Sequence, residues 1–149
     1  MTDSSHAKFM KQAIELGRKT AFDDSAGGPF GCVIVKGDRV VGEGANRVLA
    51  ENDPTCHGEI SAIRSACSAL GTHDLSGSTM YTSSEPCPMC YAAAWWARID
   101  KIYYGSTVQD SLTYGQFDDL EISKSFNLPR QDRPLPCVEL LRDEMVEVW

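Results

Sequence analysis

One His, one Glu and two Cys near the middle of the chain place the strongest constraint on its fold. His57 and Glu59 are two positions apart, and Cys87 and Cys90 follow in a Pro-Cys-Pro-Met-Cys segment. One imidazole nitrogen and two thiolates can hold a zinc ion and leave its fourth tetrahedral position open for water, as a catalytic zinc requires. Glu59 is close enough to reach that water without being a ligand, so it is a candidate general base and then general acid.

A structural zinc site is the main alternative for these residues. Two Cys separated by two residues are most often half of a structural zinc knuckle. A closed site of that kind needs a fourth ligand, and no second Cys-x-x-Cys or His-rich cluster supplies one. Cys56 is the nearby candidate, but it is adjacent to His57, and the backbone would have to bend for both to reach one ion. The catalytic assignment is therefore favoured.

The spacing of apolar residues places both parts of the motif at the starts of helices. One helix is expected to start near His57 and to stop at Gly71, with apolar residues at Ile60, Ile63, Cys67 and Leu70. A second helix is expected from Cys87 to Ala97, because prolines at 86 and 88 suit its first positions. The positive end of the helix dipole favours thiolate over thiol, so a helix start suits a metal ligand.

The remaining segments predict a three-layer α/β/α fold with a mixed five-stranded sheet. A first helix is expected to start at Asp3, Ser4 or Ser5. Strands are expected at residues 30–35, 40–45, 79–83, 101–105 and 135–141, the last interrupted early by Pro136. Residues 110–115 predict a short helix or loop, and the tail 142–149 is too short to be a stable independent helix. No repeat or linker divides the chain, so residues 1–149 are expected to form one domain.

Charge and cysteine content bear on partners and compartment. The chain has 14 Lys and Arg against 21 Asp and Glu, a formal net charge of −7, and no basic run. Nucleic-acid affinity rests largely on neutralising phosphates, so a small neutral substrate fits better than a folded RNA. The six Cys do not have the pattern of a disulfide framework. Residues 1–6 lack the features of a leader peptide, and no apolar run approaches the length of a membrane span. We expect a soluble cytoplasmic protein with no membrane partner.

With these residues in place, the chain resembles the cytidine deaminase-like superfamily, and within it the small bacterial guanine deaminases. His-x-Glu followed by Pro-Cys-x-x-Cys is the signature of zinc deaminases that act on nucleobases. The other matching segments are Gly27–Gly31, Val33–Lys36, Asn52–Thr55, Ala62–Arg64, Trp96–Arg98 and Phe117–Asp119. The resemblance implies that His57, Cys87 and Cys90 hold Zn²⁺. It implies that Glu59 is the catalytic proton shuttle.

The resemblance also implies roles in substrate binding. Phe30 is expected to pack on the base, Asn46 to hydrogen-bond its polar edge, and Asp110 to lie in the substrate pocket. Trp96 is expected to close the pocket wall near the partner subunit of a homodimer. The residues themselves leave two of these open, since Asn46 can instead cap a turn and Phe30 can fill the core.

The expected reaction is hydrolytic deamination of a free nucleobase, guanine to xanthine and ammonia. Isocytosine or cytosine is the alternative substrate, because Gly58, Ile60 and Ser61 are similar to fungal cytosine deaminases and the family usually has Ala at position 58. The chain also ends at Trp149, without the longer C-terminal extension that covers the substrate in similar guanine deaminases and can swap between subunits. Deamination of tRNA adenosine is disfavoured by the acidic composition. A non-catalytic zinc scaffold is disfavoured because the carboxylate of Glu59 is present.

Overall fold

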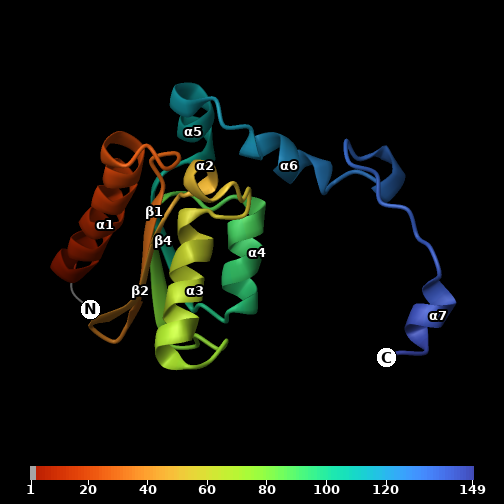
Figure 1. The fold of residues 1–149 in the computed structure, drawn as a ribbon, viewed down its shortest axis with the longest axis horizontal. Helices are drawn as coiled ribbons and strands as arrows, with labels where there is room; N and C mark the ends of the chain where they lie inside the picture. The colour runs from red at the N-terminus through yellow and green to blue at the C-terminus, as the bar shows by residue number, and fades with distance from the viewer. Residues whose placement is uncertain (1–2) are drawn as a thin grey trace.

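A four-stranded mixed sheet forms the centre of the computed structural model, which describes residues 3–149 (Figure 1). Its strands are β1 (Gly31–Lys36), β2 (Arg39–Ala45), β3 (Ser78–Ser84) and β4 (Lys101–Ser106), in the order β2-β1-β3-β4. β1 is antiparallel to β2 and to β3, whereas β3 and β4 are parallel. Gly37, at φ +62°, supplies the left-handed backbone of the tight turn between β1 and β2, which confirms the predicted hairpin.

Alternate side chains of β1 pack against two different helical layers. One face of the sheet is covered by α1 (Asp3–Arg18), in a cluster of Phe9, Ala13, Val33, Val35 and Tyr81. The other face is covered by α3 (Gly58–Leu70) and α4 (Pro88–Trp96), in a cluster that includes Cys32, Ile34, Ala62, Ala66, Met80 and Ala94. The sheet thus lies between two helical layers, and the predicted three-layer α/β/α architecture is confirmed (Figure 1).

Shorter elements complete the chain. The π-helical turn η1 (Lys19–Asp23) continues α1, and α2 (Val48–Glu51) follows β2. After β4 come α5 (Val108–Gly115), α6 (Asp119–Ser125), η2 (Arg130–Asp132) and α7 (Arg142–Val146). α5 confirms the short helix expected near residues 110–115.

The predicted fifth strand is wrong. Residues 135–141 belong to no strand or helix, and they lie on a C-terminal arm, residues 126–149, that extends away from the sheet (Figure 1). Leu135, Val138 and Leu140 are each more than four-fifths exposed, so no sheet edge of this chain covers them. Pro136 also lacks the N–H that a strand ladder needs. Near the exposed end of this arm, α7 (Arg142–Val146) forms a short helix in the tail that was expected to be too short for a stable one.

The expectation about the first residues rests partly on Met1 and Thr2, which lie outside the described part of the chain. Within residues 3–149, no helix is both long enough and apolar enough to cross a membrane. Near the start of α1, His6 Nδ1 lies 2.6 Å from the hydroxyl of Tyr81, and the His6 ring packs on Tyr103.

Candidate metal centre and substrate cavity

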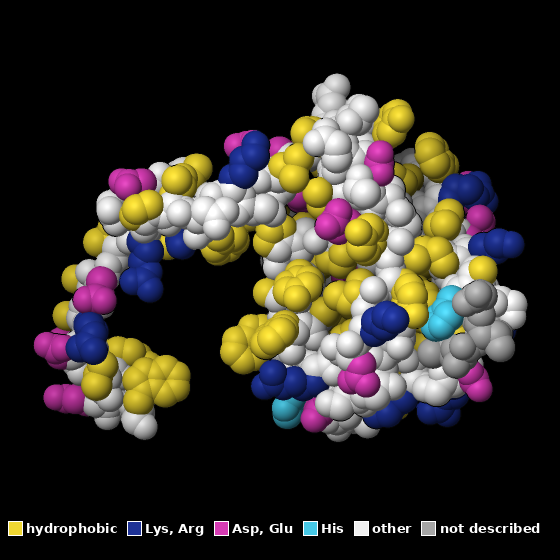
Figure 2. Space-filling model, turned by 180° about the vertical axis from the view of Figure 1, so that it is seen from behind, with side chains coloured by type: hydrophobic (Ala, Val, Ile, Leu, Met, Phe, Trp, Pro, Cys, Tyr) yellow, Lys and Arg dark blue, Asp and Glu magenta, His cyan; other side chains and the backbone are white. Residues whose placement is uncertain are grey.

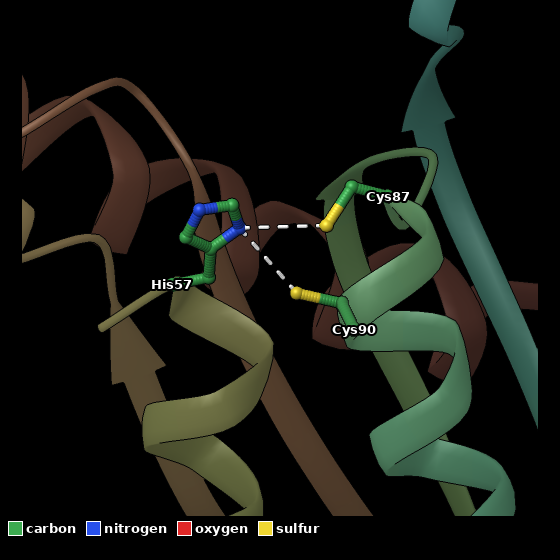
Figure 3. A group of neighbouring side chains, drawn as sticks. All are labelled: His57, Cys87 and Cys90. Atoms are coloured by element: carbon green, nitrogen blue, oxygen red, sulfur yellow. Dashed lines mark hydrogen bonds between the residues drawn. The ribbon is translucent and has the colours of Figure 1, made fainter. Parts of the chain in front are cut away.

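The two helix starts that carry the motif lie beside one another. His57 is the N-cap of α3 and Cys87 is the N-cap of α4, and both have the extended backbone typical of that position. α3 and α4 pack side by side on the same face of the sheet, with β3 carrying the chain from the end of one to the start of the other (Figure 1). Cys90 lies in the first turn of α4, so its thiol points to the same place as that of Cys87 (Figure 3).

The spacing of the three side chains fits a tetrahedral zinc ion. His57 Nδ1 lies 3.6 Å from Cys87 Sγ and 3.5 Å from Cys90 Sγ (Figure 3). Zn–S and Zn–N bonds of roughly 2.3 and 2.0 Å at a tetrahedral angle put N and S about 3.5 Å apart. Among the described residues the donor cluster has these three members, while the thiol of Cys56 faces the hydroxyl of Ser61. Three protein donors leave one position open, as in a catalytic site.

Charge around the two thiols prepares them for a metal. The hydrogen bond with Cys90 lowers the pKa of the Cys87 thiol to about 4, and His57 adds to that effect while burial opposes it. The neighbouring Cys87 and burial raise the pKa of the Cys90 thiol. Both thiols must be thiolates to bind a metal ion, so metal binding releases a proton from any thiol that is still protonated.

Glu59 lies in the first turn of α3, beside the donor cluster but not part of it. Only 5% of its surface is exposed, and burial raises the pKa of its carboxyl group. The hydroxyl of Thr82 donates a hydrogen bond to Glu59 Oε1 at 3.2 Å, which holds the carboxylate in place. A buried carboxylate with a raised pKa at this position is suited to taking up and returning a proton.

A cavity of 330 Å³ opens beside these residues. Its wall includes His57, Glu59 and Cys87 together with aromatic, amide and carboxylate side chains: Phe30, Phe117, Asn46, Glu85, Asp118 and Asp119. A mostly apolar cavity with a few convergent polar groups next to a metal site is the usual form of a small-molecule binding site.

Residues 3–106 match the family described as the cytidine and deoxycytidylate deaminase zinc-binding region. The chain belongs to this deaminase family. It is 41% identical to the guanine deaminase of Bacillus subtilis strain 168 over 140 residues, which cover 94% of this chain and 88% of the relative. It is 42% identical to the tRNA-specific adenosine deaminase of Agrobacterium fabrum over 106 residues, 71% of this chain and 67% of the relative.

Solved structures agree with the family assignment. The X-ray structure of the Bacillus subtilis guanine deaminase superposes with a TM-score of 0.91 at 38% identity, covering 99% of this chain and 91% of that one. A guanine deaminase from Nitrosomonas europaea gives a TM-score of 0.69 at 30% identity, covering 74% and 63%. The predicted resemblance and the zinc cofactor are confirmed, since the zinc-binding region of the family spans all three donor residues.

The structure brings two of the four expected substrate residues of this deaminase to the cavity. Phe30 is half-buried in its wall and packs edge-to-face on Phe117, with ring centroids 4.8 Å apart. Asn46 also lines the cavity, with 5% of its surface exposed, and its Oδ1 accepts a hydrogen bond from the N–H of Val48 at 3.2 Å. Asn46 thus caps a turn and faces the cavity at once, which combines the two alternatives left open by the sequence.

The other two expected substrate residues lie elsewhere. Asp110 does not line the cavity at the metal centre. Its Oδ2 accepts hydrogen bonds from the N–H and hydroxyl of Thr107, completing the capping box of α5 beside a neighbouring hollow. Trp96 is 72% exposed near the end of α4 and lines neither of these spaces. Its place near a partner subunit stays a prediction.

Two carboxylates at the cavity were not predicted as site residues. Asp118 and Asp119, at the start of α6, line its wall. Burial raises the pKa of Asp119, and the nearby Cys87 raises it further. Charge and hydropathy alone do not distinguish these residues from a surface turn. The match of Phe117–Asp119 to the family pattern is the one feature of the sequence that could have indicated their place at the site.

Proposed function

We propose that this chain is a zinc-dependent hydrolase that converts guanine to xanthine and ammonia. The observation that carries the proposal is the meeting of the three metal donors and the buried Glu59 at one cavity that also exposes aromatic, amide and carboxylate groups. The guanine deaminase of Bacillus subtilis, similar over 94% of this chain, supports guanine as the substrate.

The site residues divide the work between metal binding and proton transfer. His57 through Nδ1, and Cys87 and Cys90 through Sγ, would hold the zinc ion. Zinc lowers the pKa of a bound water and so supplies a nucleophile near neutral pH. Glu59 would accept the first proton of that water and pass it to a ring nitrogen, then take the second proton from the newly added hydroxyl and give it to the departing amine. A C–O bond forms at the amine-bearing carbon, the C–N bond breaks, and one water is exchanged for one ammonia.

Recognition of the base uses the remaining wall of the cavity. The ring of Phe30, held by Phe117, offers a flat apolar surface for a purine face. The side-chain N–H groups of Asn46 can donate to an oxo or ring-nitrogen acceptor of guanine. Asp118 and Asp119 can accept from its N–H groups. Such pairing discriminates strongly against bases with a different donor pattern, because mismatched polar groups would be buried without partners.

The test is a panel assay of ammonia release by the zinc-loaded protein. The substrates are guanine, isocytosine, cytosine, adenine and a tRNA anticodon stem-loop, with a Glu59→Gln preparation as the blank. We expect guanine to be deaminated most efficiently, and isocytosine, which shares its amino-oxo pattern, to come next. Turnover of cytosine or of the stem-loop without turnover of guanine would overturn the proposed substrate while leaving the metal chemistry intact.

We also propose that the chain works as a homodimer in the cytoplasm. Large apolar side chains are exposed on α4 (Tyr91, Trp95, Trp96) and along the arm (Leu135, Val138, Leu140, Trp149). Figure 2 shows such side chains both on the body and on the arm that projects from it. Patches of this kind mark interaction surfaces, and six free cysteines suit a reducing compartment. Light scattering after gel filtration should give the dimer mass, and a monomer at micromolar concentration would refute it.

A further inference from the structure

The end of α1 passes into a π-helical turn instead of stopping at a cap. In this turn, η1, the buried side chain is Thr20, which is 2% exposed. π-helical turns are rare and are frequently found at functional sites. Thr20 does not itself line the cavity at the metal centre, so any contribution to that site must pass through a neighbour.

That neighbour is Asn46. The hydroxyl of Thr20 donates a buried hydrogen bond of 2.7 Å to the main-chain carbonyl of Asn46. The next N–H, of Arg47, donates to the carbonyl of Cys56 at 2.9 Å. The two sides of the peptide between Asn46 and Arg47 are thus held by different segments of the chain. Without the hydroxyl, a buried carbonyl loses its partner and the peptide can rotate.

The residues packed around Asn46 leave little space, so rotation of this peptide would also displace the Asn46 side chain. A Cβ added to Gly27 would lie 2.1 Å from Asn46 Oδ1, so the segment after the π-turn lies directly against the Asn46 side chain. The N–H of Asn46 is tied to the carbonyl of Phe30 at 2.8 Å. A change at the Asn46 carbonyl therefore moves its side chain within the cavity wall.

We infer that Thr20 is a positioning residue for base recognition, which orients the Asn46 amide in the cavity through the buried hydrogen bond from the π-turn. The inference rests on the proposed function, because it takes Asn46 as a residue that contacts the nucleobase. This role also accounts for the π-turn, which directs the Thr20 hydroxyl inward while the two residues before it, Arg18 and Lys19, are exposed.

A purely structural role for Thr20 predicts different kinetics. Loss of stability lowers the concentration of folded enzyme, which reduces apparent kcat and leaves KM unchanged. A displaced Asn46 weakens a contact made to the substrate in both ground state and transition state, which raises KM. The KM value therefore separates the two roles.

The experiment compares Thr20→Val, which keeps the shape and removes the donor, with Thr20→Ser, which keeps the donor. Both are assayed zinc-loaded on the base that the unmodified protein deaminates best. We expect kcat/KM of Thr20→Val to fall roughly 10- to 100-fold, mostly through KM, with zinc content unchanged. Thr20→Ser should stay close to the unmodified protein. Val35→Ala, a core change on the other side of β1 from the metal helices, is the control for destabilisation and should keep a normal KM.

A double-mutant cycle decides whether Thr20 acts through Asn46. In an Asn46→Ala background, Thr20→Val should have little further effect on KM, whereas independent losses that add would overturn the inference. A normal KM in Thr20→Val, or equal losses in Thr20→Ser and Thr20→Val, would overturn it too. If Thr20→Val does not fold, Thr20→Cys, with its weak donor, takes its place with the same expected rise in KM. A preferred base other than guanine would refute the proposed substrate and leave this test intact.

Discussion

Replacing Glu59 by Gln removes the proton carrier while keeping its shape. The side chain is 5% exposed, so water has little room to replace it as a base. The amide oxygen of Gln can still accept the hydrogen bond from Thr82, and the three metal donors are unchanged. Positioned acid–base catalysis contributes roughly 10²- to 10⁴-fold. Because one carboxylate serves every proton transfer in the reaction, we expect a loss near ~10⁴-fold in kcat, or about 5 kcal/mol of barrier.

The assay measures kcat and zinc content on the same preparation, with Glu15→Gln as the matched control. Glu15 is an exposed carboxylate on α1, paired with Arg18, so its replacement should leave kcat unchanged. We expect Glu59→Gln to keep one zinc per chain and to melt at no lower temperature, since a buried charge has been removed. A kcat within tenfold of the unmodified protein would refute the role of Glu59 as proton shuttle. Loss of zinc would show instead that Glu59 is a ligand.

Three further changes test the site. Cys90→Ala should lose zinc, activity and thermal stability together, because metal binding is coupled to folding; full zinc content by elemental analysis would contradict the assignment. Gly27→Ala should raise KM with zinc retained, because the new Cβ meets the Asn46 side chain; an unchanged KM would contradict this. Asp110→Ala should lower the melting temperature slightly through loss of the α5 capping box and leave KM unchanged. A raised KM, measured under conditions where the variant is fully folded, would show instead that Asp110 contributes to substrate binding.

The metal centre could be predicted from the sequence because its parts are local. The spacing of Cys87 and Cys90 is that of one helical turn, and both clusters sit at helix starts that prolines and apolar periodicity mark. The N-termini of α3 and α4 meet because the two helices are joined by one strand and pack on the same face of the sheet. Few arrangements of a helix-strand-helix unit are possible. Four of the five predicted strands and all three covering helices were found at the expected positions.

The errors lie where the outcome depends on contacts between distant segments. Residues 135–141 have the composition of a strand, but a strand needs a partner edge, and the arm carries this segment away from the sheet. Asp118 lines the cavity although it was not predicted as a site residue, whereas Asp110 completes the capping box of α5, so its role in substrate binding stays a prediction. Local sequence does not separate the two, because both carboxylates lie at the start of a short helix.

The sequence by itself determined the chemistry of this protein: its donor types, their spacing and the nearby carboxylate specify a zinc site with one open position, since ligand identity and helix starts depend on adjacent residues. The tertiary structure alone decided which side chains share the cavity with that site. It brought Asp118 and Asp119 to the wall that also holds the expected Phe30 and Asn46, left Trp96 on the surface, and placed Thr20 behind Asn46. The physical reason is that these placements depend on packing between segments far apart in the chain: the loops after β2 and α5 and the π-turn after α1. The local sequence of any one segment does not determine that packing.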